Sequence, residues 1–97
     1  MKKNYQPFLL KPNGKREDVN PKNGTDFSLD ELKGFVGGYI QILHMGRGEL
    51  MVINEEGKLK NLPINKDATI FAKWKGVISS KDNIVGTVLI CHNSQIL

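Results

Sequence analysis

Two apolar segments joined by a glycine-rich turn constrain the fold of this chain more than any other feature. Residues 39–45 (YIQILHM) and 49–54 (ELMVIN) flank Gly46-Arg47-Gly48, a spacing and turn composition typical of a β-hairpin. Both segments carry apolar side chains on both faces. Strands of this kind are covered by a helix on one side or buried against another subunit. The sequence therefore predicts a small sheet with helical cover.

A short helix is predicted at residues 29–36, directly before this hairpin. Ser28 and Glu31 have the spacing of a capping box, in which the Ser28 hydroxyl accepts from the Glu31 backbone N–H and the Glu31 carboxylate accepts from the Ser28 amide. Gly37-Gly38 supplies a left-handed stop. These signals set both ends of the helix.

The N-terminal part of the chain predicts a second hairpin. Residues 5–11 and 15–19 are expected to be strands, joined by an Asn13-Gly14 turn whose tight form needs positive φ at both central positions. The returning strand is highly charged and therefore belongs at a sheet edge. Residues 20–26 form a loop in this interpretation, and we expect them to be flexible, like residues 1–4.

The C-terminal half predicts one more helix and one more strand. Asn65 is expected to cap a helix over residues 66–74, and residues 84–92 (IVGTVLICH) are expected to form a strand with a bulge at Gly86. The chain thus reads as a single α+β domain over residues 1–97, with a small antiparallel-rich sheet and one or two short helices.

Length and composition exclude several classes of protein. At 97 residues the chain has room for one core. Its apolar runs of four or five residues are far shorter than the roughly 20 residues that span a membrane, and its basic start is not followed by the apolar region of a signal peptide. The single cysteine, Cys91, excludes an internal disulfide framework and suits a reducing cytosol.

The net charge of +4 is unevenly distributed. Residues 1–22 carry +4, residues 23–56 carry −4 and residues 57–81 carry +5. Two basic segments around an acidic one could converge into a face that attracts anions. The alternative is that these are ordinary solvated lysines, because no run reaches the five or six consecutive like charges of a nucleic-acid-binding tail.

Catalysis has little support in the sequence. Cys91 and His92 are adjacent in a predicted strand, so their side chains point to opposite faces and cannot form a nucleophile–base pair. His44 is the only other histidine, and metal-ligand spacings are absent. We therefore expect no enzyme, no metal and no cofactor, with Cys91 as a small buried hydrophobe.

Arg47 is the first candidate ligand-binding residue. It lies between two glycines, which let backbone amides approach a ligand closely. Its planar guanidinium suits a phosphate or a carboxylate. The alternative is a hairpin turn with an exposed arginine.

Lys73, Trp74 and Lys75 form the second candidate, because a flat ring between two cations suits a nucleobase or a phosphate. The alternative is a tryptophan packed into the core between two solvated lysines. Asn54 and Asn65 are expected to contribute hydrogen bonds, since each lies at the end of a predicted element.

Two further expectations concern partners. The helix at residues 29–36 carries Asp30 and Glu31, which would repel phosphate, so sequence-specific DNA binding is not expected. Self-association is expected, because one short helix cannot cover both faces of the central hairpin and an apolar patch would remain. The candidate residues for this patch are Tyr39, Leu43, Met45, Met51 and Ile53.

Three stretches carry a resemblance to a known family. They are residues 32–41 (LKGFVGGYIQ), 52–58 (VINEEGK) and 62–69 (LPINKDAT), followed by Ile-Val-Gly at residues 84–86. In order and spacing, the chain resembles a small domain-of-unknown-function family, number 3846, known mostly from phages and mobile elements. The likeness covers about residues 5–92, and residues 12–26 look longer than is usual for this family.

The resemblance implies a setting more than a mechanism. Small non-catalytic phage proteins commonly counter host defence in the bacterial cytoplasm, by sequestering nucleotide signals or by blocking a defence protein. We therefore expect a non-enzymatic oligomer that binds a small anionic, cyclic nucleotide signal at a subunit interface. The alternatives are a module that blocks a host defence or nucleic-acid-processing protein, and a sequence-independent nucleic-acid accessory factor.

Overall fold

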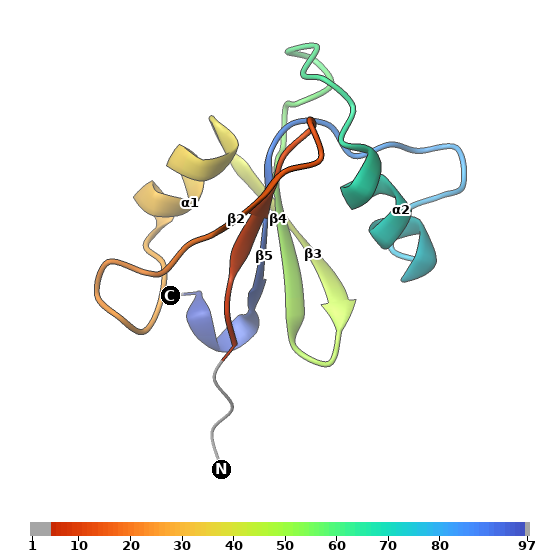
Figure 1. Ribbon diagram of the computed structural model, residues 1–97. Helices are drawn as coiled ribbons and strands as arrows, with labels where there is room; N and C mark the ends of the chain where they lie inside the picture. Colours follow the sequence, from red (N-terminus) through yellow and green to blue (C-terminus); the bar gives the residue numbers. More distant parts are fainter. Residues whose placement is uncertain (1–4, 97) are drawn as a thin grey trace.

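The computed structural model describes residues 5–96 and shows a five-stranded antiparallel sheet between two helices (Figure 1). The strand order is β2-β1-β5-β4-β3, so the last strand of the chain lies at the centre. The elements are β1 (Phe8–Leu10), β2 (Arg16–Asp18), α1 (Leu29–Val36), β3 (Ile40–Gly46), β4 (Glu49–Asn54), α2 (Lys66–Trp74), β5 (Val88–His92) and a 3-10 turn at Asn93–Gln95. The α+β class expected from the sequence is confirmed.

Helix α1 has the ends that the sequence predicts. The Ser28 hydroxyl accepts from the Glu31 amide at 3.2 Å, and the Glu31 carboxylate accepts from the Ser28 amide at 2.9 Å. Gly37 ends the helix at φ 85°, in the left-handed region that glycine enters without steric cost. Leu32 and Val36 are buried beneath it.

Helix α2 also begins and ends as predicted. The Asn65 side chain accepts from the backbone N–H of Ala68 and caps the helix. The buried face is made of small side chains, Ala68, Thr69 and Ala72. Through Ala68 and Ala72 this face joins a core cluster with Met51, Val88 and Ile90 of the sheet.

Each face of the sheet has its own core. Because side chains alternate along a strand, β4 and β5 send Leu50, Val52, Leu89 and Cys91 toward α1. The neighbouring residues point to the opposite face, where the buried side chains are Met45, Met51, Ala68, Ala72, Ile84, Val88 and Ile90. Figure 1 shows α1 and α2 on opposite sides of the sheet. The central strands are therefore buried on both faces within one chain.

This arrangement corrects the expected apolar patch. Met45 and Met51 are buried, and Leu43 and Ile53 pack against the same core from partly buried positions. The expectation was wrong because α2 covers the face that α1 cannot reach. Only Tyr39, of the five candidate residues, is a large exposed side chain.

The N-terminal hairpin and the last strand also differ from the expected bounds. In the first hairpin Gly14 has positive φ, at 87°, whereas Asn13 does not, so the turn is not the two-residue form. The Lys11 amide instead donates to the Lys15 carbonyl across a longer loop. The last strand begins only at Val88: Gly86 lies before it, with its amide donating to Pro63, and is not a bulge within the strand.

The loop over residues 20–26, expected to be flexible, contains several hydrogen bonds. The Asn23 side chain accepts from the amides of Thr25 and Asp26, and the Lys22 amide donates to the Glu31 carboxylate. Residues 1–4 lie outside the part of the chain that the structure describes. Between residues 5 and 96, the helices are all too short and polar to cross a membrane.

Candidate functional site

Arg47 occupies the tip of the β3–β4 hairpin. It is exposed and adopts a left-handed conformation with φ 55°, between Gly46 at 103° and Gly48 at 82°. The hairpin thus turns through three consecutive residues of positive φ. The guanidinium has no ion pair within residues 5–96.

The His92 side chain, at the end of β5, explains why residue 48 is a glycine. A Cβ atom at this position would lie 2.5 Å from Nε2 of His92. His92 is held in place by Ser94, whose hydroxyl lies 2.8 Å from Nδ1 and whose amide donates to the same atom. Glycine at residue 48 therefore leaves room for the His92 ring, and no ligand is needed to explain it.

A polar cluster beside this turn joins the ends of the described chain. The Tyr5 hydroxyl donates to the Glu49 carboxylate at 2.5 Å, and burial, then this hydrogen bond, raises the Tyr5 pKa well above its ordinary value. The Gln95 amide donates to the Tyr5 carbonyl and its oxygen accepts from the His92 amide. These polar groups have hydrogen-bond partners within the protein, which indicates that the cluster has a structural role.

Trp74 lies at the C-terminal end of α2 with 78% of its surface exposed. The packed alternative for this residue is therefore wrong. The Lys75 ammonium lies 5.3 Å from the centre of the indole ring, within the range of a cation–π contact. Lys73 is also exposed, so the three residues form an accessible aromatic and cationic surface.

Ile70 extends this surface, and the sequence interpretation missed it. Residues four apart lie on the same side of a helix, and Ile70, one turn before Trp74, is 60% exposed. Lys66 lies one further turn back and is exposed as well. The signal was available, since Ala68 and Ala72 define the buried side of the helix and Ile70 falls opposite to it.

Asn54 and Asn65 have other tasks in this fold. The Asn54 side chain donates to the Val36 carbonyl and accepts from the Glu56 amide. The Asn65 side chain donates to the carbonyls of Leu10 and Gly86 while it caps α2. Both residues are buried, and their amides are occupied by the protein itself.

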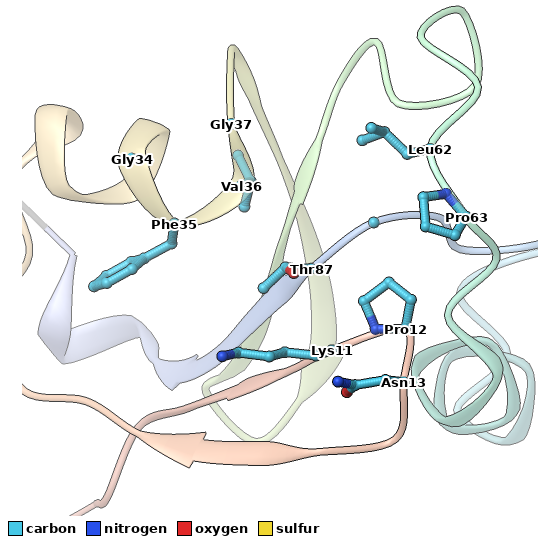
Figure 2. A pocket seen from close by; sticks show the side chains of 11 residues that line it. Lys11, Pro12, Asn13, Gly34, Phe35, Val36, Gly37, Leu62, Pro63 and Thr87 are labelled. Atoms are coloured by element: carbon cyan, nitrogen blue, oxygen red, sulfur yellow. The ribbon is translucent and has the colours of Figure 1, made fainter.

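A groove runs between α1, the turn after β1 and the segments around residues 62 and 86 (Figure 2). Its volume is about 470 Å³, and a neighbouring hollow of about 520 Å³ shares Gly34 and Phe35 with it. Lys11, the one cation in its wall, is paired with Glu17 at 2.8 Å. The walls are otherwise made mainly of apolar and backbone atoms from Phe35, Val36, Leu62 and two prolines.

The thiol and the buried polar side chains of the described residues are held within the fold. Burial raises the pKa of the Cys91 thiol to about 12, so the residue is a neutral core side chain. Within residues 5–96 there is no cluster of histidine, cysteine or carboxylate side chains suited to a metal. Every buried side-chain polar atom of that range has a hydrogen-bond partner.

The six residues singled out in the sequence do not form one site. Arg47 lies at the end of the hairpin, whereas residues 73–75 lie at the end of α2 (Figure 1). Asn54 and Asn65 are buried elsewhere. Trp74 and its two lysines, together with Ile70, remain as one continuous candidate surface.

A comparison with protein families finds one match. A family model described as "Domain of unknown function (DUF3846)" matches residues 8–95. Searches of curated proteins and of solved structures find no match.

Proposed function

This chain belongs to the DUF3846 family, and we propose that it is a non-enzymatic module that binds another protein through the outer side of α2. We call this surface the α2 face and define it by Lys66, Ile70, Lys73 and Trp74. The exposure of Trp74 and Ile70 on one side of a helix is the observation that carries the proposal.

The apolar part of the α2 face supports a protein partner. Trp74 and Ile70 lie one helical turn apart and are 78% and 60% exposed. Tryptophan is enriched among the few residues that dominate binding energy at protein interfaces, where it fills an apolar pocket of the partner. An aliphatic neighbour suits such a pocket, whereas it offers little to a phosphate backbone.

The charged part of the α2 face indicates the chemistry of the partner. Lys66 and Lys73 border the apolar pair, and Lys75 lies beside the indole ring. Asp67 is the acidic residue on the exposed side of the helix. Complementary charge speeds association and fixes orientation, so we propose a partner with an apolar pocket bordered by aspartate or glutamate.

Sequestration of a cyclic nucleotide receives less support from the geometry. The α2 face is a convex helix surface, whereas small ligands are usually enclosed in concave pockets. Arg47 lies at the hairpin tip, whereas Trp74 lies at the end of α2, and Asn54 and Asn65 have internal partners. We therefore treat nucleotide binding as a competing outcome of the experiment below.

The resemblance to phage and mobile-element proteins suggests what such a module would do. A small protein that covers one surface of a host defence or nucleic-acid-processing protein blocks it without chemistry of its own. This role is part of the proposal, and it requires that the partner be a bacterial protein.

The experiment uses the single tryptophan as both anchor and probe. Affinity capture from bacterial lysate identifies proteins retained by the wild type and lost with Trp74→Ala. The captured protein is then purified and titrated against the wild type, Trp74→Ala, Ile70→Ser and Lys73→Glu. Leu59→Ala is the matched control, because Leu59 is 83% exposed and outside the α2 face.

The proposal expects direct binding with a shift of Trp74 emission toward shorter wavelength as the ring leaves water. Loss of the anchor should weaken binding by about 2 kcal/mol or more, and Leu59→Ala should bind like the wild type. Titration with cyclic nucleotides and with single-stranded DNA runs in parallel. The proposal would be overturned if a cyclic nucleotide or single-stranded DNA quenched Trp74 emission saturably while no purified protein bound in a way that depends on Trp74.

A further inference from the structure

The two edges of the sheet are protected to very different degrees. The β2 edge is three residues long, and all three, Arg16, Glu17 and Asp18, are charged and exposed. The β3 edge, Ile40–Gly46, is seven residues long and has no lysine, arginine, aspartate or glutamate. Natural sheets usually guard a free edge with charge, proline, short length or a bulge, and β3 has only the irregularity between His44 and Gly46, at its end.

The backbone of β3 presents unpaired groups at this edge. The Glu55 amide donates to the Tyr39 carbonyl at 2.8 Å, so these facing residues form a hydrogen-bonded pair. Such pairs alternate along antiparallel strands, and the register places Ile42 opposite Val52 in a pair that does not exchange hydrogen bonds. The N–H and C=O groups of Ile40, Ile42 and His44 therefore point away from β4, and no residue between 5 and 96 forms a backbone hydrogen bond with them.

We propose that β3 pairs with β3 of a second copy of this chain, antiparallel and centred on Ile42. In this register Ile42 faces Ile42 of the other copy, and Ile40 faces His44. Every backbone group exposed at the edge then gains a partner, because a two-fold axis through the Ile42 pair makes the strand complementary to itself. The two sheets become one continuous sheet.

The side chains of β3 favour a second copy as the occupant. Ile40 and Ile42 are partly buried against the core beneath α1, and Leu43 is partly buried against the opposite core. Pairing two β3 strands therefore joins apolar side chains on both faces of the sheet with no like charges opposed. The same operation at β2 would set Glu17 against Glu17, which is destabilising.

This inference is independent of the α2 face and concerns a different surface from the expected apolar patch. That patch was to lie on the face of the hairpin, which α2 covers. The edge of β3 remains available because a helix that covers a face does not pair with the strand backbone.

Light scattering on the purified protein gives the first test. The proposal expects a mass twice that of the 10.9 kDa chain at micromolar concentration. Ile42→Pro should give a monomer with an unchanged circular dichroism spectrum, because the lost N–H has no partner within the chain and proline is tolerated at a strand edge. Asp18→Pro at the β2 edge is the matched control and should remain a dimer.

A cysteine scan tests the register and does not depend on the proline variant. The native thiol, Cys91, is buried, so a new disulfide must come from the introduced residue. Facing Cα atoms of a hydrogen-bonded antiparallel pair lie about 5.5 Å apart, within the range that a disulfide spans. Ile42→Cys should form a covalent dimer on mild oxidation, and Asp18→Cys should remain monomeric in denaturing gels.

The outcomes separate clearly. A dimer by light scattering that is cross-linked by Ile42→Cys and not by Asp18→Cys supports the pairing. A monomeric wild type, including one that binds an extended peptide of another protein at this edge, overturns it. Equal cross-linking of both cysteine variants would also overturn it, since random collision would then explain the covalent dimer.

Discussion

The side-chain amide of Asn65 donates a hydrogen bond to the carbonyl oxygen of Leu10 at 2.9 Å, across 55 residues of sequence. The same nitrogen donates to the Gly86 carbonyl at 2.9 Å, and the side-chain oxygen accepts from the Ala68 amide at 3.1 Å. One buried asparagine thus links the start of α2 to β1 and to the segment before β5.

Asn65→Ala should destabilise the fold by about 3 kcal/mol. The substitution removes a helix cap, worth about 1 kcal/mol, and takes one hydrogen bond from the part-buried Leu10 carbonyl and one from the buried Gly86 carbonyl. Urea denaturation followed by circular dichroism measures the loss. Asn83→Ala, at an exposed residue, should change stability by less than about 0.5 kcal/mol. Equal effects of the two variants would contradict the structural role of Asn65.

Local signals explain how much of the fold is readable from the sequence. The bounds of α1, α2 and β4 follow from residues that are close together in the sequence, such as Ser28 with Glu31 and Asn65 with Ala68. The central position of β5 between β1 and β4 depends on contacts between distant segments. The burial of Met51 depends on the same long-range arrangement, because it requires α2 to return to the sheet face opposite α1.

The stability of the protein should fall as acid protonates Glu31. The Ser28 amide, then the Lys22 amide, donates to the Glu31 carboxylate and holds its pKa below the ordinary value of 4.5. A group with a lowered folded pKa stabilises the fold above its unfolded pKa, and this contribution is lost as pH falls through the folded pKa.

The test for Glu31 is the pH dependence of unfolding free energy from neutral pH down through the carboxylate range. Glu31→Gln preserves side-chain length and a hydrogen-bond acceptor but cannot titrate. Its stability should therefore decline less steeply with acid than that of the wild type. Identical pH profiles for the two proteins would show that the capping carboxylate does not contribute to acid sensitivity.

The Cys91 thiol should be unreactive while the protein is folded. Burial raises its pKa to about 12, and the thiolate is the reactive form. A thiol reagent at pH 8 should label the native protein only at the rate of unfolding, and should label it at once in concentrated urea. Fast labelling of the native protein would show that the core beneath α1 opens readily.

Gly48→Ala should destabilise the protein much more than Gly46→Ala. Both glycines have positive φ, but a Cβ at residue 48 would lie 2.5 Å from His92 Nε2, whereas a Cβ at residue 46 has no atom within 4 Å. Thermal melting of the two variants measures the difference. Because His92→Ala alone loses the bonds to Ser94, the cost of Gly48→Ala is measured in both the wild-type and the His92→Ala background. It should be smaller in the His92→Ala background, which lacks the ring that the methyl group meets. An equal cost in the two backgrounds would exclude this steric cause.

The candidate site could be predicted only in part, because the sequence does not show which side of α2 packs against the sheet. The Lys-Trp-Lys motif is visible in the sequence, but burial of Trp74 and exposure of Trp74 are both compatible with its place at a helix end. The structure decides, because the small residues Ala68 and Ala72 take the buried side and leave Ile70 and Trp74 outside. Asn54 and Asn65 show the opposite case, since polar residues at the ends of elements also serve as caps.

Gly34→Ala should stabilise the protein by about 0.5–1 kcal/mol. Glycine inside a helix costs this much relative to alanine because it loses more backbone freedom on folding. Gly34 lies within α1, two residues before its last residue, and is exposed, and a Cβ there would meet no atom within 4 Å. It lines both hollows beside α1, where an added methyl group has open space. Packing therefore does not require a glycine at this position. Chemical denaturation should show a higher midpoint with an unchanged slope. A loss of stability would instead mean that the walls of the groove close on this position in solution.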